Sequence, residues 1–450
     1  MATLIHGGYV VTMNPAREVF AEGFVLLGDD GRIDAVGPSS CAPSGFAGER
    51  LDANGMIVLP GLVNAGHRPW QHLLMGLAAA TDEALLGAAE RLLDSEDLAV
   101  AATLAATELV SGGTTTVLHH LPQRADAQRL QAATAPFAAA GMRQLACIDH
   151  AATGQDAAEA ALGACAGLAA GRMGLALSVL ADPVSMAEKR VDEAALASAR
   201  TFARQHGLRI VCDLSGAADD ARWAAAARAQ GRSAPVHLME LGLLDQDWLV
   251  AGLQRLQAAD LMLIRESGCA ALATPLSDAA RGQASAHWTE LAHHGVVCAL
   301  GTGGPAFSGS ADMVEEMKAM VLLQNTLRLD PGAMSTEAVL EMATLGGARA
   351  LGLDQEIGSL EPGKRADVAV FDLRGPHCQV SHKPISTFVC CARGQDAHAV
   401  FVDGRCVHRP GRTGPDDTVI GAALARRDAL LQRARNFIAS AATPTQAATA

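Results

Sequence analysis

The sequence predicts an α/β protein, in which a parallel barrel has β structure before and after it. Between about residues 60 and 355, helical stretches rich in Ala and Leu alternate with short apolar strands. Repeated strand-then-helix units of this length are typical of a parallel barrel, whose active site lies at the carboxyl ends of the strands. Residues 2–58 and the stretch after 357 instead show short strands broken by turns. A chain of 450 residues is long enough for one large barrel and an accessory domain.

The first β region contains two short β-rich segments, at 24–27 and 33–36, separated by the turn Gly-Asp-Asp-Gly at 28–31. The region ends in the run Met-Ile-Val-Leu-Pro-Gly-Leu-Val-Asn at 56–64, which is almost entirely apolar until its last residue. This pattern predicts one buried strand whose carboxyl end opens onto a site.

The central region supplies the helices and strands of the expected barrel. Helices are expected at 97–111, 191–206 and 337–345. The apolar strands expected between the helical stretches lie at 115–118, 175–180, 209–214, 248–253, 269–273 and 296–300.

The last region returns to the β pattern. Strands are expected at 367–371 and 397–402, and Asp403-Gly404 is typical of a hairpin turn. Residues 418–438, rich in Ala and Arg, predict a terminal helix, and the small and polar residues 439–450 predict a disordered tail.

The composition fits a compact globular protein, since half of the residues are hydrophobic and 18% are charged. A net charge of -13 argues against nucleic acid or an anionic membrane as the main partner. The chain begins without a signal-peptide pattern and has no apolar run long enough to span a bilayer, so we expect a cytoplasmic protein. Its ten cysteines form no CxxC pair, which favours reduced, buried thiols.

Several motifs in chain order carry a family resemblance. They are Leu-Pro-Gly-Leu-Val-Asn at 59–64, Gly-Thr-Thr-Thr-Val at 113–117, Leu-Gly-Thr-Gly-Gly-Pro at 300–305, Gly-Ser-Leu-Glu-Pro-Gly-Lys-Arg-Ala-Asp at 358–367 and Val-Asp-Gly at 402–404. The chain resembles the amidohydrolase superfamily, in particular the branch that holds 8-oxoguanine, guanine and S-adenosylhomocysteine deaminases and the s-triazine hydrolases.

The resemblance implies a distorted (β/α)8 TIM barrel flanked by a small β-sandwich that both termini build. The implied divisions are the two parts of the sandwich at 1–58 and 358–410, the barrel at 59–357, the helix at 411–438 and the tail at 439–450. Members of the family are commonly homodimers or larger, so we also expect a homo-oligomer.

The family's chemistry uses a Zn²⁺ or Fe²⁺ ion, which imidazole and carboxylate ligands hold and which activates a water molecule. The family motif Asn-x-His-x-His corresponds to residues 64–68, so the resemblance puts two ligand positions at Gly66 and Arg68, with His67 between them. The further ligand positions fall on Asp213, Ala251 and Gly303, and the proton-shuttling glutamate corresponds to Gly216. Because a divalent ion needs several donors, we expect no metal or other cofactor.

Three functional hypotheses follow from these positions. The first is a non-hydrolytic pseudoenzyme that binds a small molecule or acts as a partner of an active paralogue. The second is a metal-independent enzyme that uses Arg68, Asp213, His67 and His119 or His120 in C–N bond chemistry. The third is a conventional metal-dependent deaminase or amidohydrolase whose ligands are misaligned here.

The individual candidates each have a structural alternative. Arg68 can bind a carboxylate or phosphate, but pairing with Asp213 is favoured because a buried charge needs a partner. His67 can be a general base, although a lone histidine is more often a satisfied polar group. Five further residues are candidates for the pocket wall: Trp70, Gln71, His119, His120 and Asp278. The structural alternative is plugging the barrel mouth for Trp70 and Gln71, and capping a loop for Asp278. An aromatic content of 3% argues against a stacked purine or triazine.

Overall fold

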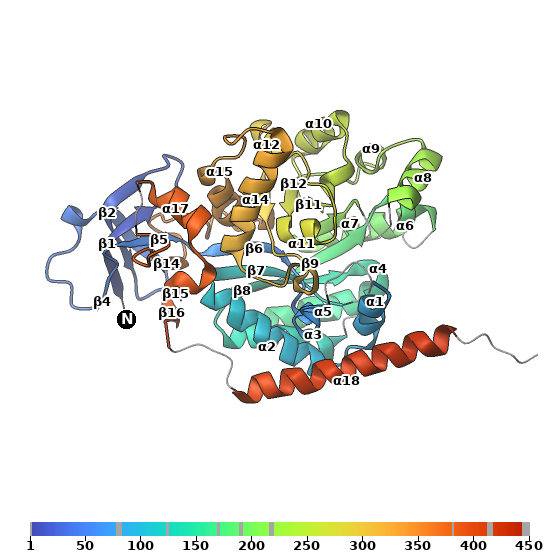
Figure 1. Ribbon diagram of the computed structural model, residues 1–450, viewed down its shortest axis with the longest axis horizontal. Coiled ribbons are helices and arrows are strands. Elements are labelled where there is room, and N and C mark those ends of the chain that lie inside the picture. Colours follow the sequence, from blue (N-terminus) through green and yellow to red (C-terminus); the bar gives the residue numbers. More distant parts are fainter. Residues whose placement is uncertain are drawn as a thin grey trace, which may run out of the picture.

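The computed structural model describes residues 2–77, 83–122, 126–168, 172–188, 192–215, 220–379, 382–411 and 417–442. A barrel surrounded by helices forms the larger part, and a smaller sheet that contains the N-terminus stands at one end of it (Figure 1). The α/β barrel with a separate β domain, which the sequence predicts, is therefore confirmed. None of the described helices is long and apolar enough to cross a membrane.

The barrel sheet has eight strands that pair in chain order and in parallel. They are β6 (Leu62–His67), β7 (Thr114–His120), β8 (Arg143–Asp149), β9 (Met173–Leu180), β10 (Arg209–Asp213), β11 (Trp248–Ala251), β12 (Ala270–Ala273) and β13 (Cys298–Leu300). A parallel bridge between His67 and Gly303 brings the chain after β13 against the end of β6. All eight carboxyl ends consequently surround one opening.

Strand β8 is absent from the sequence prediction. It begins with Arg143 and Gln144, two polar residues that interrupt the apolar pattern but are buried in the structure. Gln144 donates to the backbone oxygen of Thr134 and bonds the ring of His119, while Arg143 pairs with Asp367. Tertiary partners therefore allow a strand start that local pattern does not reveal.

The apolar run at 56–64 is two strands rather than the single strand expected. β5 (Met56–Pro60) belongs to the small sheet, and β6 belongs to the barrel. The change of sheet occurs at Gly61, where a Cβ atom would lie 2.2 Å from Oγ1 of Thr115. Only glycine fits this close approach, so the chain passes from one domain to the other without a polar loop.

The small sheet joins strands from both ends of the chain. Its order is β16-β15-β14-β5-β1-β2-β3, with β4 beside β1. The strands not yet located are β1 (Thr3–Val11), β2 (Val19–Leu27), β3 (Ile33–Pro38), β4 (Glu49–Asp52), β14 (Val368–Asp372), β15 (Ala397–Val402) and β16 (Arg405–His408). The expected hairpin turn at Asp403-Gly404 connects β15 and β16. The side chain of Arg143, on barrel strand β8, forms ion pairs with Asp367 and Asp403 of the small domain and so links the two domains.

Helices surround the barrel, and the last helix of the following series also contacts β5 of the small sheet. They are α1 (Glu83–Leu92), α2 (Ser95–Ser111), α3 (Ala127–Ala139), α4 (His150–Thr153), α5 (Gln155–Leu168), α6 (Pro183–Ala187), α7 (Glu193–His206), α8 (Asp220–Gln230), α9 (Ala234–Glu240), α10 (Ala258–Ser267), α11 (Pro275–Ala280), α12 (Trp288–His293), α13 (Pro305–Ser308), α14 (Met313–Arg328), α15 (Thr336–Glu341), α16 (Gly347–Leu351) and α17 (Pro384–Cys391). Short 3₁₀ turns lie at Ser39–Cys41, Pro69–Leu74, Leu253–Arg255 and Gly394–Asp396, and a π turn at Met342–Gly346 joins α15 to α16.

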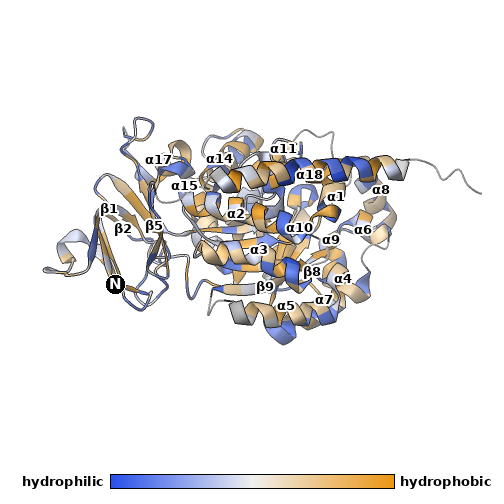
Figure 2. Ribbon diagram, turned by 90° about the horizontal axis from the view of Figure 1, so that it is seen from below, coloured by the Kyte–Doolittle hydropathy of each residue, from blue (hydrophilic) through white to orange (hydrophobic). Residues whose placement is uncertain are grey.

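The terminal helix α18 (Asp417–Ala442) runs along the barrel beside α1 and α2 (Figures 1 and 2). It ends four residues later than the predicted end at 438, because alanine at 439, 441 and 442 favours continuation of the helix. The rest of the predicted tail, 443–450, lies outside the described residues. Arg426 and Arg433 anchor the helix to the carboxylate of Asp97, at distances of 2.7 and 2.6 Å.

Candidate active site

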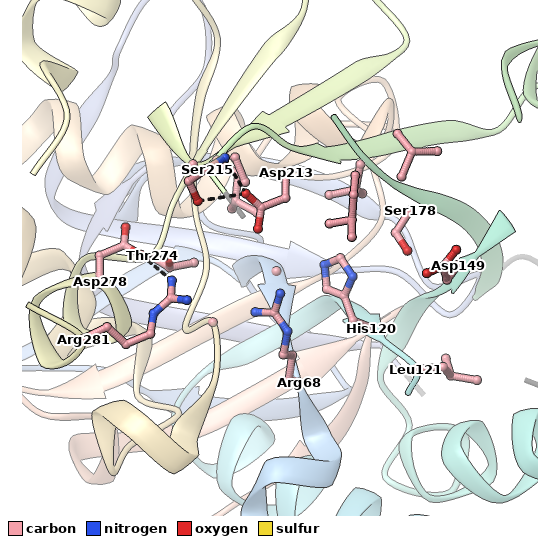
Figure 3. A pocket seen from close by; sticks show the side chains of 18 of the residues that line it. Arg68, His120, Leu121, Asp149, Ser178, Asp213, Ser215, Thr274, Asp278 and Arg281 are labelled. Atoms are coloured by element: carbon pink, nitrogen blue, oxygen red, sulfur yellow. Dashed lines mark hydrogen bonds and ion pairs between the residues drawn. The ribbon is translucent and has the colours of Figure 1, made fainter. Parts of the chain in front are cut away.

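A cavity of about 180 Å³ lies where the carboxyl ends of the barrel strands meet. Successive strands contribute polar groups to its wall (Figure 3). The wall includes Gly66 and Arg68 at the end of β6, His120 at the end of β7, Asp149 at the end of β8, Ser178 on β9, Asp213 at the end of β10, Ala251 at the end of β11, Thr274 after β12 and Gly303 after β13. The cavity is therefore the place where a barrel of this kind carries its chemistry.

The side chain of Arg68 is partly exposed in the cavity. Its backbone N–H donates to the oxygen of Gly303 at 2.9 Å, but its guanidinium makes no hydrogen bond or ion pair with the described residues. Burial lowers the pKa of Arg68, and Arg281 lowers it further, while Asp213 acts in the opposite direction. A guanidinium nevertheless keeps its charge at any physiological pH, so Arg68 is a cation without a protein counter-ion among these residues.

The expected ion pair between Arg68 and Asp213 does not form. The Oδ1 atom of Asp213 accepts hydrogen bonds from the backbone N–H and the hydroxyl of Ser215, both at 2.9 Å. This turn at the end of β10 holds the carboxylate, so Asp213 and Arg68 face each other across the cavity (Figure 3). The prediction of a direct pair is wrong because a local turn competes for the carboxylate.

Asp213 carries a negative charge at neutral pH. Burial alone would raise the pKa of its carboxyl. The Ser215 N–H, followed by the positive charges of Arg281 and Arg68, outweighs burial and holds the pKa below its usual range. An ionised carboxylate in a cavity can accept a proton from a bound water molecule.

His120 is the last residue of β7, and its ring lies beside Arg68 in the cavity (Figure 3). Burial, together with the charge of Arg68, lowers the pKa of His120 to about 3. The ring is therefore neutral at physiological pH, with one nitrogen that donates and one that accepts.

Asp278 lies on the side of the cavity away from His120 and forms an ion pair with Arg281 (Figure 3). Its Oδ1 atom accepts from Arg281 at 3.1 Å and from the hydroxyl of Thr274 at 3.1 Å. Burial raises the pKa of Asp278, although Arg281 and Thr274 act against this rise. Arg281 also donates to Gln283 at 3.1 Å and lies 5.5 Å from the ring of Phe307. Arg281, the second arginine of the cavity wall, therefore has protein partners, unlike Arg68 among the described residues.

Of the candidate residues, Trp70 lines the cavity, whereas His67, Gln71 and His119 do not. The ring of His67 is buried and bonds the hydroxyl of Thr302 at 2.9 Å. His119 is buried, bonds Gln144 at 3.0 Å and stacks on Phe137. Successive side chains of a strand point to opposite faces, so Arg68 and His120 face the cavity while their neighbours His67 and His119 face away.

Gln71 also lies away from the cavity. Its Oε1 atom accepts from the N–H of Ala306 at 3.3 Å, and the side chain fills the space beside Gly304. Gln71 therefore packs the turn after β13, which corresponds to the structural alternative for this residue.

Sequence reasoning missed Asp149, Ser178 and Arg281 as wall residues. Asp149 ends β8, the strand that the pattern did not reveal, and its carboxylate caps α4 through the N–H of Ala152 at 3.1 Å. Recognition of that strand would have placed Asp149 at the barrel mouth. Arg281 follows a short helix, and its position depends on tertiary packing alone.

The residues around the cavity do not fit the divalent ion that the family resemblance implies. In the part of the chain that the structure describes, three ligand atoms from His, Cys, Asp or Glu approach within 4.8 Å at His377, Cys378 and Asp396, none of which lines the cavity. A Cβ at Gly66 would lie 2.6 Å from Cδ2 of Leu272, so another side chain fills that ligand position. Gly216, the position of the family's glutamate, lies outside the described residues.

The family model of the amidohydrolase family matches residues 57–407. A 5-methylthioadenosine/S-adenosylhomocysteine deaminase of Desulforudis audaxviator is 31% identical over 93% of this chain and 97% of its own length. A 5'-deoxyadenosine deaminase of Methanosarcina mazei is 28% identical over 89% of this chain and 91% of its own length. An adenosine deaminase structure from Xanthomonas campestris with bound zinc has 25% identity and a TM-score of 0.84, and covers 96% of this chain and 98% of that one.

These relatives overturn the first functional hypothesis, a non-hydrolytic pseudoenzyme. Several curated proteins that align with about nine tenths of the chain are named as deaminases, which release an amino group by hydrolysis. The two enzymatic hypotheses therefore remain for this chain.

Proposed function

The chain belongs to the amidohydrolase family, and from this premise we propose that it hydrolyses an exocyclic C–N bond of a small N-heterocycle and releases the amino group. One observation carries the proposal: an ionised carboxylate, a neutral imidazole and a guanidinium with no counter-ion among the described residues surround one cavity at the strand ends. The deaminase names of relatives that align along nearly the full chain support the reaction class.

Asp213 is the proposed general base. In the hydrolysis, a water oxygen forms a bond with the ring carbon that carries the amino group, and Asp213 accepts the water proton. The C–N bond then breaks, and the same carboxyl group returns the proton to the leaving nitrogen, which departs as ammonia. Asp213 is ionised at neutral pH because its pKa is lowered, so its carboxylate is in the form that can accept the water proton.

His120 and Arg68 have binding roles in this proposal. The neutral ring of His120 donates one N–H to a ring nitrogen, on which negative charge develops when water adds. Arg68 supplies a fixed positive charge and several N–H donors on the facing wall. Because the wall residues do not form a metal donor set, the proposed reaction uses the chain's own side chains.

The test is ammonia release by the purified full chain on a panel of amino-substituted purines, pyrimidines and triazines. We expect release from at least one of them, with a fall of at least about 100-fold in kcat when Asp213 is replaced in Asp213→Asn. Absence of ammonia from every compound, or full activity of Asp213→Asn, would overturn the proposal.

A matched control is Asp247→Asn. Asp247 is also an aspartate of the barrel, but it lies at the amino-terminal end of the strands, 3.8 Å from Arg209. Its replacement removes the same charge far from the proposed reacting groups, and we expect kcat to stay within about twofold of the wild-type value.

A further inference from the structure

We infer that the ligand of this cavity carries a carboxylate that pairs with Arg68, which makes the substrate an amino-substituted heterocyclic carboxylate. The heterocycle and its amino group rest on the proposed function. The carboxylate rests on the surroundings of Arg68, which the next observations describe.

The guanidinium of Arg68 is a cation that has no counter-ion among the described residues. Removing a charge from water is costly unless an opposite charge or several hydrogen bonds replace the lost hydration. Arg68 is nonetheless directed into a cavity of about 180 Å³, where Figure 3 shows its guanidinium between the walls. An anionic ligand would provide the missing partner.

Three of the four acidic side chains of the described wall accept hydrogen bonds from groups other than Arg68, and the fourth, Glu90, forms no ion pair with Arg68. Asp213 accepts two hydrogen bonds from Ser215, Asp278 accepts from Thr274 and Arg281, and Asp149 accepts from the N–H of Ala152. None of these carboxylates lies within ion-pair distance of Arg68. The position opposite Arg68 is therefore open to a ligand rather than closed by the protein.

The charges of the wall favour a carboxylate over a phosphate. Arg281 is paired with Asp278, so Arg68 is the one cation without a counter-ion among the described wall residues. Asp149, Asp213 and Glu90 add negative charge to the same cavity. These residues repel a phosphate group, whose charge approaches -2 at neutral pH, more strongly than a carboxylate, whose single charge one guanidinium balances. The guanidinium fork also matches the two carboxylate oxygens.

The same wall orients such a ligand. Arg68 and Asp213 face each other from opposite sides, and His120 lies beside Arg68 (Figure 3). A carboxylate on Arg68 directs the other end of a small ring towards Asp213, which attracts an amino group. The geometry thus places the exocyclic nitrogen beside the proposed general base.

The experiment compares two ligands that differ in charge alone and carry the amino group opposite the acid group, 2-aminopyrimidine-5-carboxylate and 2-aminopyrimidine-5-carboxamide, by isothermal titration calorimetry. We expect the full chain to bind the carboxylate at least about tenfold more tightly. In Arg68→Met the difference should fall below about twofold. Arg68→Lys, which keeps the charge but loses the fork, should show an intermediate difference.

The control variant is Arg209→Met, which removes one guanidinium at the other end of the barrel. Its carboxylate preference should equal that of the wild type. Circular dichroism checks that each variant is folded, and Arg68→Lys serves if Arg68→Met is not. Equal affinity for the two ligands, a preference that survives in Arg68→Met, or tighter binding of inorganic phosphate would overturn the inference. So would a lack of binding by pyrimidine, purine and triazine carboxylates alike.

Failure of this inference and failure of the proposed function give different results. Carboxylate-dependent binding without ammonia release from any bound heterocycle would overturn the proposed function alone. Ammonia release from uncharged heterocycles, with no preference for carboxylates, would overturn the inference alone.

Discussion

Arg68 and His67 are adjacent in the chain, yet they have opposite environments. The guanidinium of Arg68 faces the cavity, whereas the ring of His67 is buried against Thr302 and His72. The motif at 64–68 could be aligned from sequence, but the exposure of each side chain depends on the strand's alternation. The sequence therefore predicts Arg68 as a cavity residue, while the absence of its ion pair with Asp213 required the turn at Ser215 to be seen.

At the residue scale, buried histidines predict how stability depends on pH. Burial lowers the pKa of His119 from 6.5 to about 4, although the hydrogen bond that its ring donates to Oε1 of Gln144 acts in the other direction. The unfolded state therefore binds a proton more readily than the folded state. The stability that depends on neutral His119 is complete above pH 6.5 and is lost as the pH falls towards 4.

We expect the free energy of unfolding to fall between pH 7 and pH 5, with about 1–2 kcal/mol of the loss due to His119. Urea unfolding of the wild type and of His119→Asn at both pH values measures this contribution. The pH-dependent loss should be smaller in the variant by that amount, whatever its stability at pH 7. An identical loss in the two proteins would show that His119 does not titrate as described.

Elements with regular apolar patterns were predictable, and the missed boundaries have physical causes. Seven of the eight barrel strands overlap predicted segments, because buried parallel strands are apolar along their length. β8 was missed because Arg143 and Gln144 find their partners only in the folded protein. The division between β5 and β6 was missed because the two strands are both buried and meet at Gly61.

At the element scale, α18 depends on the buried carboxylate of Asp97. Its side chain is 0% exposed and pairs with both Arg426 and Arg433 of α18. Loss of one guanidinium leaves a buried charge poorly compensated, and we expect Arg426→Met to reduce the free energy of unfolding by about 1–3 kcal/mol. Arg427→Met, which removes an exposed pair with Asp428, should change it by less than about 0.5 kcal/mol. Equal effects in chemical denaturation would contradict the role of this anchor.

At the scale of the whole molecule, one face of the small sheet shares an apolar core with the barrel, and a buried polar connection adds to this contact. The side chain of Arg143 is 5% exposed and reaches from β8 to Asp367 and Asp403 of the small domain. The barrel opening lies at the other end of the strands, where eight strand ends supply the cavity wall. The fold and the location of the cavity therefore followed from the sequence pattern, whereas this buried connection between domains did not.

The cavity wall also differs from a metal centre as a whole. Gly66, Ala251 and Gly303 offer no side-chain donor, and the side chains of Leu272 and Ser277 occupy space next to two of these positions. Replacing Gly66 or Gly303 by a metal ligand would not restore a metal centre, because neighbouring side chains already occupy the space beside it. The proposed chemistry instead uses Arg68, His120 and Asp213, which come from the ends of three different strands.

The most direct test of this account measures ammonia release against metal content in the same preparations. The full chain is produced with and without added zinc or iron, treated with a chelator, and analysed for bound metal by mass spectrometry. We predict that the rate of ammonia release from the best heterocycle stays constant while the metal content falls below about one tenth of an equivalent. A rate that rises in proportion to tightly bound metal, up to about one equivalent, would contradict the account.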